Sequence, residues 1–226
     1  MKKSIRKYYN SDVSRIVGEL ISDGHMQNDY RNLISFYSEH KYLIDSFSKR
    51  MNDVFNVSSW IYQDKRSVRY KLFINSKEVL IKLELLGVPS GNKTNQIFLV
   101  PDWIYSGSKN IKSNFLSAIF DCEGYIYKTT NKKNGKIRWR IGIEYYKNEK
   151  YLDSAKLFMN QIREMLLDFG IISSPVRLKK GNIRKDGSKS IGVRFEIEMK
   201  SFKNFYKYIN FHIETKRGRL HKALFP

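Results

Sequence analysis

Two nine-residue stretches decide the fold, and they read Ile16-Val17-Gly18-Glu19-Leu20-Ile21-Ser22-Asp23-Gly24 and Leu116-Ser117-Ala118-Ile119-Phe120-Asp121-Cys122-Glu123-Gly124. Each stretch has apolar residues at helical spacing and ends in an acid followed by glycine. Glycine directly after a helix favours a left-handed cap, so we expect each acid to close a helix. Because the two acids lie 100 residues apart, we expect one supersecondary unit used twice.

The residues after the second stretch predict a complete α-β-β-α-β-β-α unit. Polar and apolar side chains alternate in two strands, with Ile137, Trp139, Ile141 and Ile143 on one face of the first and Ile191, Val193, Phe195, Ile197 and Met199 on one face of the second. The predicted order is a strand at 125–130, a turn at 131–135, a strand at 136–146, a helix at about 150–169, strands at 175–180 and 189–199, and a helix from Ser201.

The first half repeats this order with weaker signals. We predict a helix at 12–23, a strand at 31–37, a helix at 40–56, a hairpin at 57–75 and a helix at 76–86. Residues 87–112 contain two prolines and three glycines and are interpreted as a connector that packs through Trp103. The predicted organisation is an N-terminal half at 1–87, a linker at 88–112 and a C-terminal half at 113–226. The predicted class is α+β, a pseudo-twofold duplication with two antiparallel four-stranded sheets.

Charge points to a polyanionic partner. The chain has 226 residues, 42 Lys and Arg, 22 Asp and Glu, and a net charge of +20. Such an excess of positive charge favours binding to nucleic acid, because neutralising its phosphates releases counterions. The alternative is a half-solvated sheet with its charges facing water. The candidate DNA-binding side chains lie on the predicted hairpins: Lys65, Arg66, Arg69, Lys71, Lys128, Arg138, Arg140, Arg177, Lys179, Arg184, Lys189 and Arg194.

Composition excludes other classes. A lone Cys122 rules out an intramolecular disulfide framework and a multi-cysteine zinc site, and four histidines argue against histidine-rich metal chemistry. No apolar run approaches the roughly 18 residues of a membrane span, so we expect no membrane partner. The basic N-terminus has no apolar stretch behind it, so we expect no signal peptide.

The two stretches resemble the LAGLIDADG motif of homing endonucleases, and both align to it without gaps. The second copy carries Asp121 at the first acidic place of the motif, whereas the first copy has Ile21 there and Glu19 where the family usually has an apolar residue. The repeated unit and the connector extend the resemblance over nearly the whole chain, and the connector looks like that of archaeal single-chain members.

The resemblance implies a monomeric nuclease that cuts both strands of a long pseudo-palindromic duplex across the minor groove, leaving short 3′ overhangs. Gly18 and Ala118 would let two helices pack closely, which places the acids Asp23 and Glu123 side by side. These acids, with Gly24 and Gly124 after them, would hold Mg²⁺, for which Mn²⁺ could substitute. We expect such a protein in the cytoplasm of a prokaryote, archaeal by its connector, or in an organelle.

The family also implies basic and polar helpers near the metal. Lys93 and Lys216 would stabilise the phosphorane or lower the pKa of the attacking water. Ser38 or His40 in the first half, and Asn148 in the second, would organise water, although a His or Asn that opens a helix is more often a cap. The sequence leaves open the target site, the number of metal ions and the origin of the gene.

Three alternatives remain. A LAGLIDADG protein without cleavage could bind nucleic acid only, or act as an intron maturase with intron RNA as its partner. Gly124-Tyr125-Ile126-Tyr127 superficially resembles the GIY-YIG nucleases but lacks the partner tripeptide. Asp102 with Glu198 and Lys200 superficially resembles a PD-(D/E)xK nuclease, although the spacing is long and Glu198 belongs naturally to a strand's polar face.

Overall fold

The computed structural model describes residues 5–64, 67–130, 135–184 and 187–225. It divides the chain into two compact units, one of residues 1–93 and 101–122 and the other of residues 94–100 and 123–226. These bounds differ from the predicted halves, since most of the second motif helix lies in the first unit and the linker is shared. Among the described residues, no helix combines the length and apolar character needed to cross a membrane.

The first unit contains one αββαββα array and the motif helix of the second. Its sheet has the strand order β1-β2-β4-β3, and all neighbours are antiparallel. The 3-10 turn η1 (Arg6–Tyr8) precedes α2 (Ser11–Ile21), β1 (Gly24–Gln27), β2 (Leu33–Ser38), α3 (Lys41–Phe55), β3 (Trp60–Gln63), β4 (Tyr70–Asn75) and α4 (Lys77–Leu85). The linker contributes η2 (Lys93–Asn95) and α5 (Asp102–Tyr105), and α6 (Lys109–Glu123) follows.

Local chemistry explains where these elements begin and end. The side chain of Asn10 accepts a hydrogen bond from the backbone N of Val13 at 3.0 Å and starts α2, and Ser76 starts α4 in the same way. Asn56, with a φ of +53°, ends α3 in the left-handed conformation. One sheet face is buried under the helices, with Phe36 stacked on Phe47 of α3.

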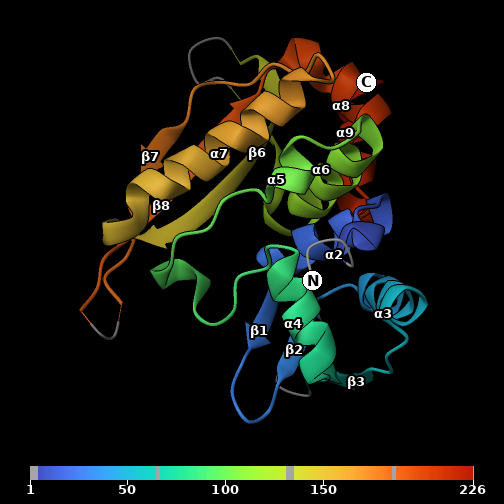
Figure 1. Ribbon diagram of the computed structural model, residues 1–226. Coiled ribbons are helices and arrows are strands. Elements are labelled where there is room, and N and C mark those ends of the chain that lie inside the picture. The colour runs from blue at the N-terminus through green and yellow to red at the C-terminus, as the bar shows by residue number, and fades with distance from the viewer. Residues whose placement is uncertain (1–4, 65–66, 131–134, 185–186, 226) are drawn as a thin grey trace. The chain divides into compact units, whose positions relative to one another are not determined.

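The second unit repeats the array. Its sheet has the order β5-β6-β8-β7, again antiparallel throughout, and Figure 1 shows the long helix α7 lying across β6 and β8. Its elements are β5 (Gly124–Thr130), β6 (Ile137–Asn148), η3 (Glu149–Tyr151), α7 (Leu152–Leu167), β7 (Arg177–Lys179), β8 (Ser190–Ile197), η4 (Met199–Ser201), α8 (Phe202–Tyr208) and α9 (Glu214–Leu224). The predicted duplicated α+β class and both four-stranded sheets are confirmed.

The structure corrects several predicted details. The short strand β1 and the helix α9 were not predicted, and α6 begins at Lys109, four residues before the predicted start of the C-terminal half at 113. Met199, predicted to continue the apolar face of β8, lies in η4 and is 54% exposed. The connector does pack through Trp103, whose Nε1 donates to the Leu86 carbonyl at 2.9 Å and whose ring stacks on Tyr9.

Candidate active site and nucleic-acid interface

Asp23 follows α2 rather than ending it. The helix stops at Ile21, and Ser22 and Asp23 form a turn in which the Asp23 side chain is exposed. Gly24 then begins β1 and is buried. The predicted left-handed cap is wrong, because neither Gly24 nor Gly124 is among the glycines with positive φ. Close approach requires the glycine instead, since a Cβ on Gly24 would lie 2.5 Å from the Cα of Leu20.

Lys93 binds the carbonyl end of α2. Its Nζ donates to the carbonyl oxygens of Leu20 at 3.0 Å, Ile21 at 2.8 Å, Ser22 at 2.5 Å and Gly24 at 2.6 Å. Carbonyls at a helix C-terminus carry partial negative charge, so an ammonium group is stabilised there. Lys93 therefore acts on the backbone on both sides of Asp23, and the Gly24 carbonyl, predicted as a metal ligand, accepts one of its hydrogen bonds.

His25 is a neighbour of this turn that the sequence did not single out. It follows Gly24 in β1 and is half-buried. Burial and the positive charges of Lys93 and Arg31 lower the pKa of its imidazole. The lowered pKa favours the neutral form of the imidazole.

Glu123 occupies the matching place in the second copy. It is the last residue of α6 and half-exposed, and Gly124 begins β5 and is buried. Lys216 lies in α9, with its Nζ 5.8 Å from the centroid of the Phe211 ring. The same helix is tied to β5 by Arg219, whose Nη1 donates to the Ile126 carbonyl at 3.2 Å. The roles predicted for Glu123, Gly124 and Lys216 stay predictions.

The two motif helices α2 and α6 pack tightly. A Cβ added to Gly18 would lie 2.8 Å from the Cβ of Ala118 and 3.0 Å from the Phe115 carbonyl oxygen. Nearer the start of both helices, Ser14 Oγ donates to the Ile111 carbonyl at 2.9 Å. The helices therefore run in the same direction, and the predicted role of Gly18 and Ala118 in close packing is confirmed.

A buried ionic network joins these helices to α3. Arg15 Nε lies 3.2 Å from Glu19 Oε1 and its Nη2 lies 2.8 Å from Asp121 Oδ2, while Arg50 Nη2 lies 2.6 Å from Glu19. Arg15, Glu19 and Asp121 are all at most 5% exposed. Burial alone would lower the pKa of Arg15, but the charges of Glu19 and Asp121 and the hydrogen bond to Asp121 hold that pKa above its ordinary value.

The network explains two features of the sequence. Glu19 stands where the motif usually has an apolar residue, and Asp121 is present only in the second copy. Both carboxylates meet the single guanidinium of Arg15, so Glu19 is buried as one member of a compensated set. The sequence did not predict this network; the i,i+4 spacing of Arg15 and Glu19 is its one local signal, because Asp121 lies 106 residues from Arg15.

The open face of the second sheet carries a cluster of cations. Alternation places Arg138, Arg140, Arg194, Arg177 and Lys179 on this face. Glu144 contacts Lys179 at 2.9 Å and Arg194 at 3.9 Å, and Glu196 contacts Arg140 at 2.5 Å. Arg177 lies directly opposite Arg194, which is unfavourable without an anion between or above them. Within the described part of the chain, no carboxylate forms an ion pair with Arg138 or Arg177.

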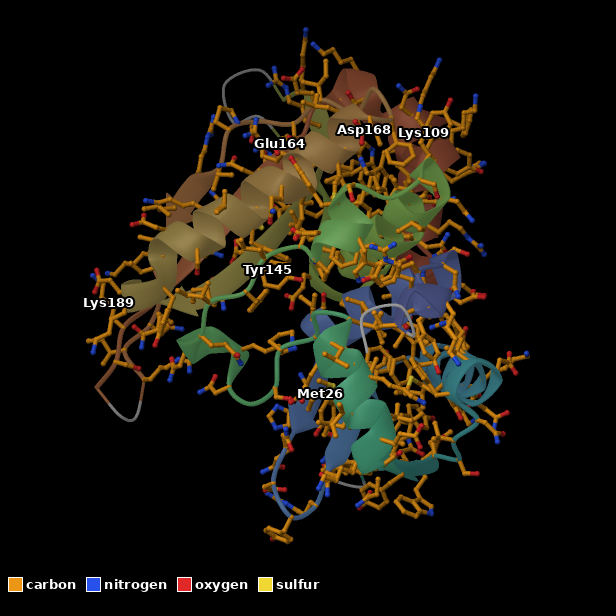
Figure 2. The ribbon with its side chains drawn as sticks, viewed as in Figure 1. Met26, Lys109, Tyr145, Glu164, Asp168 and Lys189 are labelled. Carbon is orange, nitrogen blue, oxygen red and sulfur yellow. The ribbon has the colours of Figure 1, made fainter. Side chains whose placement is uncertain are left out.

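Other predicted DNA-binding residues lie elsewhere. Lys128 pairs with Trp139 and shares the face of Ile126, so its predicted grouping with Arg138 on the open face is wrong. Arg184 and Lys189 lie beyond the strands, where Arg184 Nη2 donates to Thr94 Oγ1 at 3.1 Å. Lys189 is at the end of the β8 hairpin, remote from Glu164 and Asp168 at the other end of α7 (Figure 2).

The first sheet presents few cations in the described residues. Lys71 lies on its open face and contacts Asp64 at 2.8 Å. Arg69 precedes β4, with its Nε 4.0 Å from Glu39. Lys65 and Arg66, also predicted to bind DNA, lie outside the described residues. A basic face matching that of the second sheet is therefore not visible in the described part of β1–β4.

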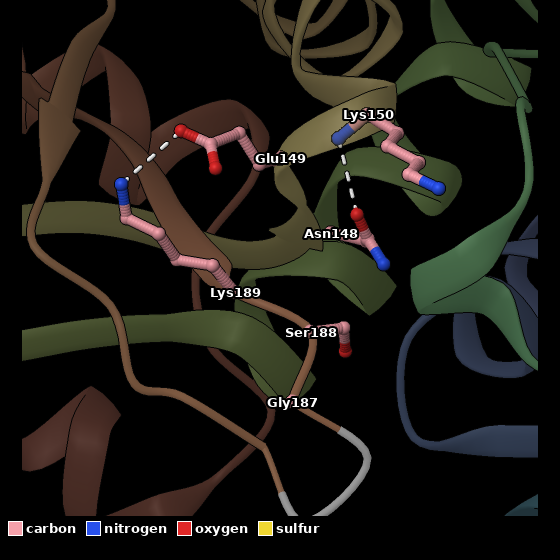
Figure 3. Close-up of a pocket in the computed structure, with 6 residues that line it drawn as sticks. All are labelled: Asn148, Glu149, Lys150, Gly187, Ser188 and Lys189. Atoms are coloured by element: carbon pink, nitrogen blue, oxygen red, sulfur yellow. Dashed lines mark hydrogen bonds and ion pairs between the residues drawn. The ribbon is translucent and has the colours of Figure 1, made fainter.

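Two side chains predicted to organise water accept hydrogen bonds from backbone N–H groups two residues further along the chain. Ser38 Oγ accepts from the backbone N of His40 at 3.1 Å, and Asn148 Oδ1 accepts from the backbone N of Lys150 at 3.1 Å. A pocket of about 470 Å³ lies beside Asn148 (Figure 3). Its lining residues are Asn148, Glu149, Lys150, Gly187, Ser188 and Lys189. Lys189 and Glu149 form an ion pair of 3.1 Å at its edge.

The residues of the rival nuclease motif belong to two different units. Glu198 is the residue before η4 and forms an exposed ion pair of 2.9 Å with Lys200. Asp102 opens α5 in the other unit. Among the described residues, no three His, Cys, Asp or Glu side chains gather into a group able to hold a metal ion by themselves.

Comparison with protein families gives a match in the second half. Residues 110–210 match the family model described as a LAGLIDADG-like domain. The match includes α6, the whole second sheet and α8.

Curated relatives are longer proteins with unrelated names. The chain is 32% identical over 151 residues to the RNA polymerase subunit Rpo1N of Methanocaldococcus jannaschii, covering 67% of this chain and 11% of that protein. It is 27% identical over 214 residues to the glutamine–fructose-6-phosphate aminotransferase of the same organism, covering 94% and 17%. It is 28% identical over 190 residues to the tRNA-splicing ligase RtcB of Methanopyrus kandleri, covering 76% and 19%. The chain thus spans less than a fifth of the length of each.

Solved structures share the fold along nearly the whole chain. The homing endonuclease I-DmoI in complex with DNA and Ca aligns with a TM-score of 0.58 at 14% identity, covering 95% of this chain and 98% of that one. The N-terminal LAGLIDADG domain of DUF199/WhiA aligns with a TM-score of 0.52 at 14% identity, covering 95% and 87%. Residues 110–210 thus match a LAGLIDADG-like domain, and the solved structures show that the αββαββα fold of both halves is that of I-DmoI.

Proposed function

We propose that the protein is a site-specific endonuclease that hydrolyses both strands of duplex DNA with Mg²⁺, for which Mn²⁺ can substitute. The observation that carries this proposal is the contact between Gly18 of α2 and Ala118 of α6. Asp23 lies five residues after Gly18, and Glu123 lies five residues after Ala118. Two helices that run in the same direction and touch at equivalent residues lead to equivalent ends, so the two acids are expected to converge.

The residues present fit a divalent cation. Two carboxylates that converge repel each other and therefore favour a bound cation, and all-oxygen ligation suits Mg²⁺. Since the described residues offer no group of three protein ligands, water and phosphate oxygens would complete the shell. Structures of I-DmoI were solved in complex with its target DNA in the presence of Mg and of Mn.

The chain's own residues hold the metal, position the two acids and contact the DNA in this proposal. Asp23 and Glu123 would hold the metal, which would supply activation of the attacking water and stabilisation of the leaving 3′ oxygen. Lys93 positions the turn of Asp23 by binding the carbonyls on both sides of it. Lys216, predicted at the equivalent place of the second half, would serve Glu123 in the same way. The cations of the second sheet contact DNA phosphates and bases.

Similar sequences occur within otherwise unrelated proteins, which supports the view that this segment is inserted into different hosts. One stretch of sequence recurs as a small part of an RNA polymerase subunit, an aminotransferase and an RNA ligase, whose named activities have nothing in common. A segment inserted into different hosts by a sequence-specific nuclease explains this distribution. We place the protein with its DNA target, in the cytoplasm of a prokaryote or in an organelle, and as a monomer because one chain holds both copies of the motif.

Cleavage selection on a randomised duplex library with Mg²⁺ tests the proposal. Wild-type protein should enrich one long, imperfectly palindromic site and cut it. Asp23→Asn and Glu123→Gln should each reduce cleavage by at least a hundredfold while leaving duplex affinity within about threefold. Asp12→Asn, an exposed acid at the other end of α2, is the matched control and should cut normally.

The same experiment decides between the nuclease and the binding protein. A wild-type protein that binds a selected duplex tightly but cuts no member of the library would refute the nuclease proposal. Tight binding of structured intron RNA together with stimulated splicing would favour the maturase. Full activity of Glu198→Ala, together with loss at Asp23, would exclude the rival motif.

A further inference from the structure

The open faces of the two sheets differ in their number of cations: that of the second sheet carries five, beside Tyr125, Tyr127 and Tyr146, and the described part of the first carries few. Register places Trp60, Phe73 and Ser35 in one row across β3, β4 and β2 of the first sheet. The next row on the same face contains Tyr62, Lys71 and Tyr37. Trp60 is 65% exposed and Tyr62 is 50% exposed. We call Trp60, Tyr62, Tyr37 and Phe73 the aromatic face.

The aromatic face carries almost no free charge in the described residues. Lys71 is its one described cation, and the ion pair with Asp64 compensates it and raises its pKa. Tyr37 and Phe73 meet edge to face, with centroids 6.4 Å apart. The topologically equivalent face of the second sheet presents Arg138, Arg140, Arg177, Arg194 and Lys179.

We propose that the aromatic face reads a thymine-rich half-site in duplex DNA through the thymine C5-methyl groups, while the arginine face of the second sheet reads a guanine-rich half-site. This inference rests on the proposed DNA binding and adds the chemistry of each half-site. A β-ribbon fits the major groove, where the thymine methyl group is the apolar feature and guanine O6 and N7 accept from Arg. The aromatic face can make apolar contacts with the thymine methyl group, and the arginine face can donate hydrogen bonds to guanine O6 and N7.

The two faces should also respond differently to salt. Contacts of Lys and Arg with phosphates release counterions, so affinity falls with salt, whereas apolar contacts with methyl groups release none. The slope of log K against log salt should come from the second sheet. Removing Arg138 or Arg177 should make that slope shallower by about 0.9 for each phosphate that is no longer neutralised. Removing Trp60 or Tyr62 should weaken binding at every salt concentration and leave the slope unchanged.

The experiment uses the full chain and a duplex selected by binding from a randomised 30-base-pair library. Thymine is replaced by deoxyuridine, which deletes only the methyl group, in one half-site at a time. We expect each buried methyl group removed from the thymine-rich half to weaken wild-type binding about fourfold. The same replacement should have no effect on a Trp60→Ala/Tyr62→Ala double variant. Ile61→Ala, on the opposite face of β3, is the matched control and should keep the full deoxyuridine effect.

The outcomes separate this inference from the nuclease proposal. Selected duplexes without a thymine-rich half, or duplexes that bind and are cut but are insensitive to deoxyuridine, would overturn the inference alone. A protein that never cuts but shows the half-specific deoxyuridine effect would overturn the nuclease and support the inference. If the double variant lost affinity for single-stranded oligonucleotides and kept its duplex affinity, the aromatic face would be a stacking platform for unpaired bases, and the inference would be wrong.

Discussion

Lys93 acts through the backbone of the turn that carries Asp23. Its ammonium group is the hydrogen-bond donor for four carbonyls, so Lys93→Met leaves them without that partner. We expect a loss of about 1–3 kcal/mol in the free energy of unfolding, measured by urea denaturation. Lys222→Met, an exposed cation of α9, should change it by less than about 0.5 kcal/mol. Equal effects of the two substitutions would contradict a positioning role for Lys93.

Arg15 and Asp121 form the buried ion pair that joins the two motif helices. Arg15→Leu removes the guanidinium that contacts the buried Asp121 carboxylate, and Asp121→Leu removes one of the two carboxylates that contact Arg15. Breaking a buried pair on one side costs about 3–5 kcal/mol, whereas replacing both members by apolar residues often costs little. The double variant should therefore be destabilised by clearly less than the sum of the two single variants. Additive effects in this double-mutant cycle would show that the two side chains are independent.

Glu144 gives the second sheet a pH-dependent contribution to stability. Burial would raise the pKa of Glu144, but hydrogen bonds from Tyr146 and Lys179 and the charges of Lys179 and Arg194 lower it below its ordinary value. A carboxylate with a depressed folded pKa stabilises the protein above its unfolded pKa, and this stability is lost as pH falls through the folded pKa. Glu144→Gln should thus reduce the free energy of unfolding at pH 7 and have progressively less effect below about pH 4. A difference that is constant from pH 7 to pH 3 would contradict this assignment.

At the scale of elements, substitution by alanine should have opposite effects on stability at two glycines that lie outside the turns. Gly142 lies in the middle of β6, where a Cβ would meet the Tyr125 hydroxyl at 2.4 Å and the Phe195 carbonyl at 2.6 Å. Gly218 lies in α9 with nothing within 4 Å of an added Cβ. Gly142→Ala should destabilise by about 1–3 kcal/mol because the sheet must shift. Gly218→Ala should stabilise by about 0.5–1 kcal/mol through helix propensity, and thermal unfolding can compare the two.

Helix α9 shows why an element can be missed. Of its residues, only Leu220 is buried, so the segment has no apolar periodicity. A tertiary contact stabilises the helix instead, because Arg219 donates a hydrogen bond to the Ile126 carbonyl of β5. Strand β1 was missed for a related reason, since four residues with Gly and His are too few to show alternation. By contrast α2, α3, α6 and α7 have long apolar stripes and were all predicted close to their observed bounds.

At the scale of the whole molecule, binding and cutting should separate. The net charge of +20 makes duplex affinity depend on salt, while cutting depends on a metal held by two acids. Chelation with EDTA should abolish cleavage of the selected duplex and leave binding at low salt intact, as measured by fluorescence anisotropy. Excess Mg²⁺ should restore cutting. Cleavage that persists in EDTA would contradict the metal mechanism.

The sequence by itself determined the duplicated αββαββα fold, the pairing of small residues at Gly18 and Ala118, and the two acids as the candidate site. The fold follows from periodicity within each half, and the paired small residues and the acids follow from the resemblance of both stretches to one motif. Only the tertiary structure decided that Lys93 binds the end of α2, that Asp121 completes the set around Arg15, and that one open sheet face is aromatic and the other cationic. Those facts depend on contacts between residues 69 to 106 positions apart and on strand register. A shift of one residue in register moves every side chain to the opposite face.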